Sequence, residues 1–149
     1  MRILVQRVKQ AKVAVNGRDV AEIGQGLLLL VGVGKDDTSD DIEYLSKKVS
    51  SLRIFEDDQG KMNLDIKQVK GRILSVSQFT LFASTKKGNR PGFEQSAAPD
   101  MAEEFWLRFN NLLRENDIEV KEGIFAAHME VDLLNDGPVT IWLDSKNRT

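Results

Sequence analysis

The N-terminal part of the chain places β-branched apolar residues at the alternating positions that are typical of strands. Segments 3–15 and 20–23 are separated by Asn16-Gly17, a dipeptide that favours a tight hairpin turn. The run LLLLVGV at 27–33 is apolar on both faces, which indicates a strand in the middle of a sheet. The pattern therefore predicts three strands before the first helix.

Two later segments repeat apolar residues every three or four positions, which predicts two amphipathic helices. The first follows Thr38-Ser39-Asp40-Asp41, a sequence that favours a capped helix start. The second begins at Pro99, a favoured first helical residue, and ends near Asn116. The apolar positions are Ile42, Leu45, Val49 and Leu52 in the first helix, and Met101, Phe105, Phe109 and Leu112 in the second.

The remaining patterned segments are again strand-like. RILSVSQFTLF at 72–82 is predicted to be a strand, and EDDQGKMN at 56–63 a hairpin turn. Alternating apolar residues at 129–133 and 139–143 predict a closing hairpin around NDGPVT. Strands dominate and the helices do not alternate with them. We therefore expect one α+β domain over residues 1–149, with a mostly antiparallel, barrel-like sheet and two main helices.

Composition excludes several classes of function. The chain has 149 residues, a formal net charge of −2, no cysteine and one histidine. Thiolate chemistry, disulfides and Cys- or His-rich metal sites are therefore excluded, and we expect no metal or cofactor. The longest apolar run is far shorter than a membrane span, and the charged opening MRILVQRVKQ does not resemble a signal peptide. We expect a cytoplasmic protein without membrane contact.

Two weak motifs do not change this picture. GVGKDDT at 32–38 lacks the glycine and the Ser or Thr that a phosphate-binding loop requires. His128 is the one side chain whose ordinary pKa lies near neutrality, so a triad of Ser77, His128 and a carboxylate is conceivable. No nucleophile-elbow motif surrounds Ser77. We therefore interpret His128 as a packing or surface residue.

The segment SQFTL, residues 77–81, carries more information. Ser77, Gln78 and Thr80 are three hydrogen-bonding residues at the end of an otherwise apolar strand. Such groups are costly unless a cleft exposes them or partners satisfy them. Backbone N–H groups at a strand end are also suited to stabilising an oxyanion. A cleft and a simple capped strand end both fit the pattern.

The loop STKKGNRPGF, residues 84–93, gathers basic side chains between glycines. Lys86, Lys87 and Arg90 suit phosphate oxygens, but a solvated loop has the same composition. The local pattern favours the solvated loop.

NDGPVT, residues 135–140, is unusual for a hairpin because Pro138 has no N–H to give to a ladder. A proline at an edge and a cis Gly137-Pro138 bond with two carbonyls aimed together both fit the local sequence.

SQFTL and NDGPVT together resemble the paired signature of the D-aminoacyl-tRNA deacylases. The resemblance covers nearly the whole chain, including LRIFEDDQGKMNLDI, KKGNRPGF and VTIWLD. It implies a homodimer that hydrolyses the ester between a D-amino acid and the terminal adenosine of tRNA. It also implies that a cis Gly137-Pro138 bond enters the partner's active site as a selectivity clamp, with Arg7 bracing that loop.

The resemblance further implies which residues form the site. Ser77, Gln78, Phe79 and Thr80 would form the catalytic pocket, with Met129 as an additional substrate contact. Lys86, Lys87 and Arg90 are the candidates for contacts with tRNA. Water attack aided by backbone N–H groups near Phe79 and by the substrate's 2′-hydroxyl is the favoured mechanism, with Thr80 as a covalent nucleophile the alternative.

Selectivity would follow from a clash with L side chains, so achiral glycyl-tRNA is a plausible second substrate. Two other classes of function compete with the enzyme: a non-catalytic tRNA-binding module and a structural dimer. A net charge of −2 and 7% aromatic residues do not favour the first. The second gives no reason for polar residues gathered in SQFTL.

Overall fold

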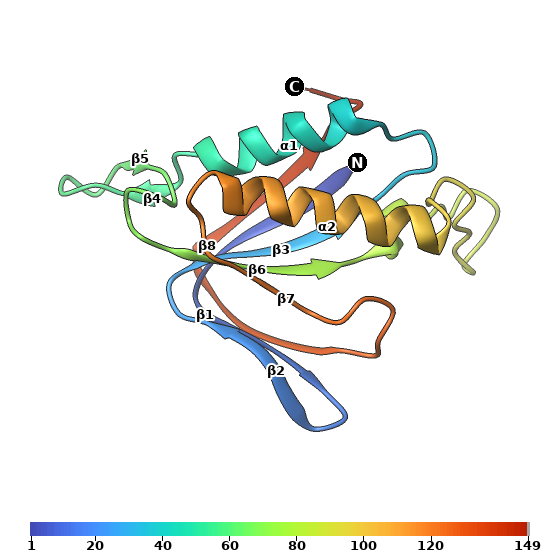
Figure 1. Cartoon of the computed structure of the whole chain (residues 1–149), viewed down its shortest axis with the longest axis horizontal. Helices are drawn as coiled ribbons and strands as arrows, with labels where there is room; N and C mark the ends of the chain where they lie inside the picture. Colours follow the sequence, from blue (N-terminus) through green and yellow to red (C-terminus); the bar gives the residue numbers. More distant parts are fainter. Residues whose placement is uncertain (149) are drawn as a thin grey trace.

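A computed structural model describes residues 1–148 of the chain. One curved, barrel-like sheet carries six strands. Five of them follow the order β2-β1-β3-β6-β7, and the sixth, β8, lies outside this order and pairs with β1. A separate hairpin of two short strands lies at one end of the molecule (Figure 1). The strands are β1 (Arg2–Val15), β2 (Arg18–Ile23), β3 (Gly26–Gly32), β4 (Phe55–Glu56), β5 (Met62–Leu64), β6 (Arg72–Ser77), β7 (Val120–Glu122) and β8 (Glu130–Asp144).

Strand β1 is the centre of the sheet, because it pairs with β2, β3 and β8. The predicted hairpin turn is confirmed: Asn16 and Gly17 have φ angles of 52° and 76°, as a tight two-residue turn requires. The apolar run of β3 lies between β1 and β6, which confirms that it is an interior strand.

Strand β8 is one continuous strand, so the prediction of a closing hairpin is wrong. It runs antiparallel to β1 from Arg2↔Asp144 to Ala14↔Glu130. The register shifts in the middle, where Gln6 pairs with Thr140 and Val8 pairs with Asn135. Residues 136–139 therefore bulge out of the ladder opposite Arg7, and we call them the Gly-Pro bulge. Because these residues leave the ladder with β1, pairing does not require an N–H from Pro138, and a proline is tolerated here.

The expected helices are α1 (Ser39–Ser51), capped by Thr38, and α2 (Pro99–Glu115). They cover one face of the sheet side by side (Figure 1). The sheet is mixed rather than mostly antiparallel, because β3–β6 and β6–β7 are parallel pairs. Parallel neighbours need a crossover, and α1 and α2 lie in the two crossovers. Within residues 1–148, neither helix is long and apolar enough to cross a membrane.

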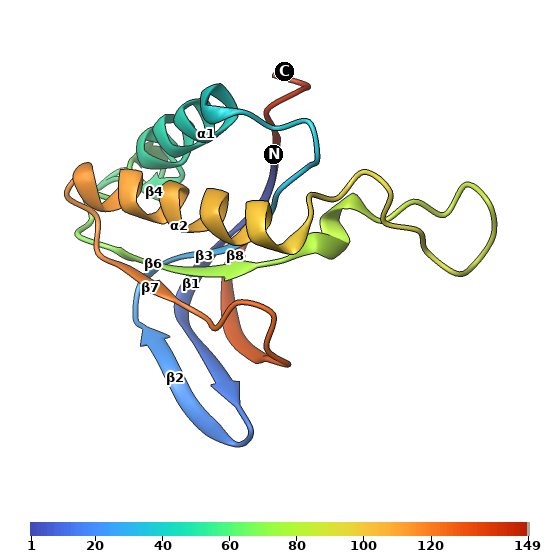
Figure 2. The ribbon, with the colours of Figure 1, turned by 45° about the vertical axis from the view of Figure 1, so that its right-hand side comes forward.

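Apolar side chains fill two cores, one on each face of the curved sheet. The larger core packs β1, β3 and β6 against the helices, with Phe109 and Leu113 fully buried. The smaller core lies inside the curl formed by the β1–β2 hairpin and β8, around Val8, Val13 and Leu74. Figure 2 shows this hairpin curling away from the helical layer. The two cores hold the ends of β3 and β6 in a fixed position.

The segment predicted as the end of a strand changes conformation after Ser77. A 3-10 helix, η1 (Phe79–Phe82), follows β6 instead. Leu81 N–H donates to Gln78 O at 3.4 Å and Ala83 N–H to Thr80 O at 3.0 Å. Gly32 makes room for this turn, since a Cβ there would lie 2.9 Å from Gln78 O.

We expect the stability of the fold to fall in acid through Asp41, at the start of α1. Its carboxylate accepts hydrogen bonds from Lys146 Nζ at 2.8 Å and Thr38 N–H at 2.7 Å. Burial raises the pKa of Asp41, but the bonds from Lys146, Ser145 and Thr38 outweigh burial and hold the pKa well below its ordinary value. This stabilisation is complete above about pH 4 and is lost as the pH falls further.

The Asp41→Asn variant should therefore lower the free energy of unfolding by about 1–2 kcal/mol at pH 7, the usual size of a lost helix cap. Urea denaturation between pH 7 and pH 2 should show the difference from the wild type shrinking below about pH 4. The exposed Asp58→Asn is the matched control and should change little at any pH. A difference that does not depend on pH would contradict the role of the Asp41 carboxylate.

Candidate active site

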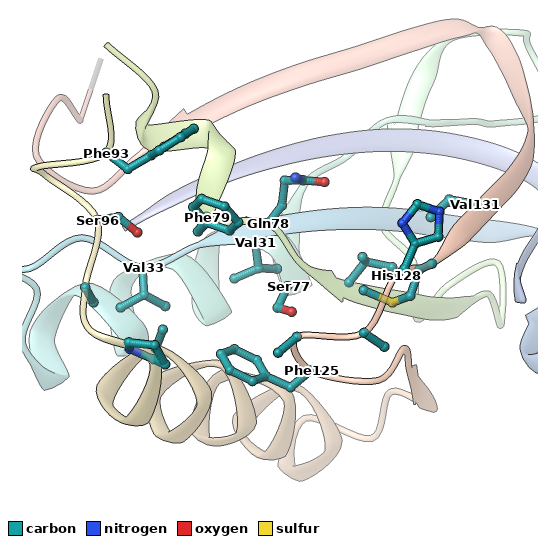
Figure 3. A pocket seen from close by; sticks show the side chains of 17 residues that line it. Val31, Val33, Ser77, Gln78, Phe79, Phe93, Ser96, Phe125, His128 and Val131 are labelled. Atoms are coloured by element: carbon teal, nitrogen blue, oxygen red, sulfur yellow. The ribbon is translucent and has the colours of Figure 1, made fainter. Parts of the chain in front are cut away.

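A pocket of about 590 Å³ opens where β3 and β6 end beside the start of α2. It has apolar walls and a few hydrogen-bonding groups (Figure 3). Its size suits a nucleoside-sized ligand. The lining residues used below are Ser77, Gln78, Phe79, Phe93, Phe125, His128 and Met129. The structure thus brings together four residues predicted for the site, Ser77, Gln78, Phe79 and Met129.

The end of β6 places SQFTL at the rim of this pocket. Ser77 still pairs with Val31 of β3, and Gln78 N–H donates to Val31 O at 2.7 Å. The backbone then turns into η1, which carries Phe79 outward, with 56% of its surface exposed. Thr80 does not line the pocket, but its hydroxyl accepts a hydrogen bond from Gln78 Nε2. SQFTL is therefore a cleft segment and not a capped strand end.

The first N–H groups of η1 have no intrahelical acceptor. The first hydrogen bond within the turn is donated by Leu81 N–H to Gln78 O. The N–H groups of Phe79 and Thr80 come before this bond along the chain. Phe79 lines the pocket, and Thr80 follows it directly along the chain, outside the lining. Two adjacent backbone donors are an arrangement that can hold a developing oxyanion.

Aromatic rings from three separate segments form the walls. Phe79 packs edge-to-face on Phe93 of the basic loop, with ring centroids 4.8 Å apart. Phe125 comes from the loop after β7 and packs on Trp106, whose indole N–H donates to Ser75 Oγ at 2.8 Å. In Figure 3, Ser77 lies between Phe79 and Phe125. The sequence reasoning did not assign Phe93 or Phe125, because single aromatic residues in loops carry no distinctive spacing.

His128 also lines the pocket, with an exposed side chain. It is therefore a surface residue within the site. No carboxylate lines the pocket, and among residues 1–148 no ion pair links His128 to an acid. A triad of Ser77 and His128 therefore has no third member. The same described residues contain no group of three or more acidic or His side chains suited to a metal ion.

Arg7 holds the Gly-Pro bulge from the opposite strand. Arg7 is 5% exposed, and its guanidinium donates to Asp136 O at 3.1 Å and to Ile54 O at 2.8 Å. The carboxylates of Asp136 and Glu56 lie 3.4 and 3.9 Å from it. A Cβ on Gly137 would approach Arg7 Nη2 to 3.0 Å, so glycine permits the close contact. Arg7 therefore ties the bulge to the β4–β5 hairpin.

The bond between Gly137 and Pro138 is cis, and both residues are exposed. Neither residue, nor Arg7, lines the pocket of the same chain. The structure thus places the SQFTL pocket and the Gly-Pro bulge apart within one chain.

The basic loop carries the last of the predicted site residues. Ser84 and Gly92 form an antiparallel bridge at its base, and Lys86, Lys87 and Arg90 are all exposed. Figure 2 shows the loop projecting from the body of the molecule. Lys86 lines a second, polar pocket, which neither Lys87 nor Arg90 lines.

This chain resembles known proteins over nearly its whole length. The family described as D-Tyr-tRNA(Tyr) deacylase matches residues 4–144. A solved structure of a c-Myc DNA Unwinding Element Binding Protein is 39% identical, with 97% of this chain and 98% of that chain covered and a TM-score of 0.91. A second, described as a probable eukaryotic D-amino acid tRNA deacylase, is 19% identical over 95% of this chain and 97% of that chain, with a TM-score of 0.81, and shares the fold. The structure places SQFTL at a pocket and Arg7 against the Gly-Pro bulge. The family model matches nearly the whole chain, so the chain belongs to the D-Tyr-tRNA(Tyr) deacylase family.

Proposed function

We propose that the protein hydrolyses D-aminoacyl-tRNA in the pocket beside η1, releasing free tRNA and the D-amino acid, as a proofreading enzyme of the cytoplasm. The observation that carries the proposal is the start of η1 beside a nucleoside-sized pocket. Phe79 lines that pocket, and among the described residues the N–H groups of Phe79 and Thr80 precede the first internal hydrogen bond of η1. The family match over residues 4–144 supports the same activity.

The chemistry needs little from side chains, because the substrate is an activated ester. Water attacks the ester carbonyl carbon, and the negative charge that develops on the carbonyl oxygen is held by the N–H groups of Phe79 and Thr80. The bond to the ribose oxygen then breaks, and that oxygen takes up a proton as tRNA leaves. The 2′-hydroxyl of the terminal ribose assists the attacking water. Gln78 and Ser77 position the substrate at the rim of the pocket.

This mechanism predicts that the Thr80 hydroxyl is dispensable. Among the described residues it is bonded to Gln78, and no base lies against it. Thr80→Ala should therefore keep single-turnover deacylation of D-tyrosyl-tRNA within about ten-fold of the wild type, since its N–H remains. Thr80→Val, which keeps the shape without the hydroxyl, is the matched control. A loss of about 1,000-fold or more in both folded variants would support a covalent Thr80 instead.

The Gly-Pro bulge supplies the selectivity. We place it in the pocket of the partner in a homodimer, where the carbonyls of Gly137 and Pro138 face the substrate's α-amino group. An L side chain would meet them, whereas a D side chain points out of the pocket. Support comes from the exposure of the bulge, its separation from the chain's own pocket and its attachment to Arg7.

A filter of this kind rejects L-amino acids only through their side chain, so glycyl-tRNA should also be cleaved. We expect its kcat/KM to lie closer to that of D-alanyl-tRNA than to that of L-alanyl-tRNA. Release of labelled amino acid from the three substrates measures this. Glycyl-tRNA that is as resistant as L-alanyl-tRNA would contradict rejection by side-chain clash.

A non-catalytic nucleic-acid-binding protein is the competing function, and one relative is named for binding DNA. The net charge of −2 does not favour it, because such binding draws mainly on contacts with phosphates. The two functions differ in turnover. With D-tyrosyl-tRNA in large excess, an enzyme releases many equivalents of D-tyrosine per chain. A binding module releases none.

A further inference from the structure

On the other side of η1 lies a second pocket, of about 470 Å³, which the deacylation chemistry does not use. Within residues 1–148, its lining is rich in hydrogen-bond donors and contains no acidic residue. The lining residues are Arg2, Phe82, Ala83, Ser84, Thr85, Lys86 and Gln95. Two cations, two hydroxyls and an amide around one hollow suit an anion rather than a cation or an apolar group.

Arg2 is held rigidly at this pocket. Its guanidinium lies 4.5 Å from the ring centre of Phe82, and its Nη1 donates to Leu81 O at 2.9 Å. Its Nε donates to Asp144 Oδ2 at 3.2 Å. Among residues 1–148, no acceptor bonds to its Nη2. A fixed planar guanidinium with unused N–H groups is well prepared for an oxyanion such as a phosphate.

The two pockets are joined by η1 itself. Phe79, at its first residue, lines the larger pocket, and Phe82, at its last, lines the polar pocket. A 3-10 helix of four residues is about 8 Å long, at about 2 Å per residue. This length is comparable to one nucleotide step of an extended single strand. A strand whose terminal nucleoside occupies the larger pocket can therefore place a nearby phosphate in the polar pocket.

We propose that the polar pocket binds a phosphodiester of the single-stranded 3′ end of the substrate, next to the terminal nucleoside. This subsite deepens the proposed function and rests on it. Arg2 and Lys86 supply the charges, and Ser84, Thr85 and Gln95 complete the set of donors. Phosphate contacts of this kind position a nucleic acid without reading its sequence, so the subsite would serve any tRNA with the same end.

The test compares two substrates, D-tyrosyl-tRNA and 2′(3′)-O-D-tyrosyl-adenosine, which lacks every phosphate. The measured quantity is kcat/KM for D-tyrosyl-tRNA divided by kcat/KM for 2′(3′)-O-D-tyrosyl-adenosine. In Lys86→Met this ratio should fall about ten-fold, and the slope of log kcat/KM for the tRNA against log salt should become shallower by about 0.7. Arg2→Met should also lower the ratio. It should slow both substrates as well, because Arg2 holds Leu81 of η1.

The matched control is Lys67→Met, which removes an exposed lysine that lines neither pocket. If the ratio and the salt slope of Lys86→Met and Arg2→Met equal those of Lys67→Met, the subsite is overturned. If the wild type cleaves neither substrate, the proposed function itself fails. The two failures are therefore distinguishable.

Discussion

Replacing Arg7 with methionine should reduce kcat/KM for D-tyrosyl-tRNA by about 100-fold, the scale on which a small displacement of a positioning group acts. The variant leaves Asp136 O and Ile54 O without their donor and removes the counter-charge of two carboxylates. The free energy of unfolding should fall as well, by about 2–4 kcal/mol for a buried charged hydrogen-bonding group. The Gly-Pro bulge then loses its fixed position.

Two further variants separate misplacement of the bulge from general unfolding. Arg7→Lys keeps the charge but loses the fork that reaches Asp136 and Ile54 together, so its loss of activity should be intermediate. Lys12→Met, on the same strand, removes a half-buried partner of Asp19 and should stay within about two-fold of the wild type. An Arg7→Met protein that is folded by circular dichroism and fully active would contradict the bracing role.

Mixing two inactive variants should restore activity, if each bulge completes the partner's pocket. Arg7→Met damages the bulge and leaves the pocket intact. Ala127→Trp places a large ring at a position that lines the pocket and leaves the bulge intact. A heterodimer of the two contains one intact pocket facing one intact bulge. Random pairing of equal amounts should then give about a quarter of the wild-type activity.

The experiment requires co-expression or joint refolding of the two variants, followed by single-turnover deacylation of D-tyrosyl-tRNA. Each variant alone, treated in the same way, is the control. If the bulge acts on its own chain's pocket, every chain in the mixture carries one defect and no activity returns. That result would remove the cross-subunit filter.

The local elements of the fold were predictable because they follow from short-range patterns. The turn at Asn16-Gly17, the cap at Thr38 and the helix start at Pro99 each depend on neighbouring residues. The pairing of β8 was not predictable in this way. Alternating residues on both sides of NDGPVT look the same whether the strand folds back or continues past a bulge. Only the register against β1, a long-range property, decides between them.

The mixed sheet has a similar explanation. Residues 33–71 between β3 and β6 contain both a helix and a short hairpin, so the simple strand-helix-strand pattern of a crossover is hidden. The end of β6 also depends on tertiary packing. The apolar run continues through Phe79 and Leu81, but the close approach of Gly32 to Gln78 fits a turn into η1.

From the chemistry of single residues, the pocket was predictable only where polarity stood out against an apolar strand, whereas Phe79 and Met129 were identified through the family resemblance. Ser77 and Gln78 were found for that reason, and both line the pocket. Phe93 and Phe125 come from loops, where an aromatic side chain gives no sign of the cavity it faces. Arg2 lies in an ordinary strand pattern. Its importance is visible only once the fold brings it against η1.

The most direct test of the account is the hydrolysis of D-tyrosyl-tRNA and L-tyrosyl-tRNA by the purified wild-type protein under identical conditions. The account predicts rapid, catalytic release of D-tyrosine and an L ester that decays no faster than in buffer alone. A discrimination of about 100-fold or more in kcat/KM would agree with a steric filter at a rigid site. Equal cleavage of both esters, or of neither, would contradict a D-selective deacylase.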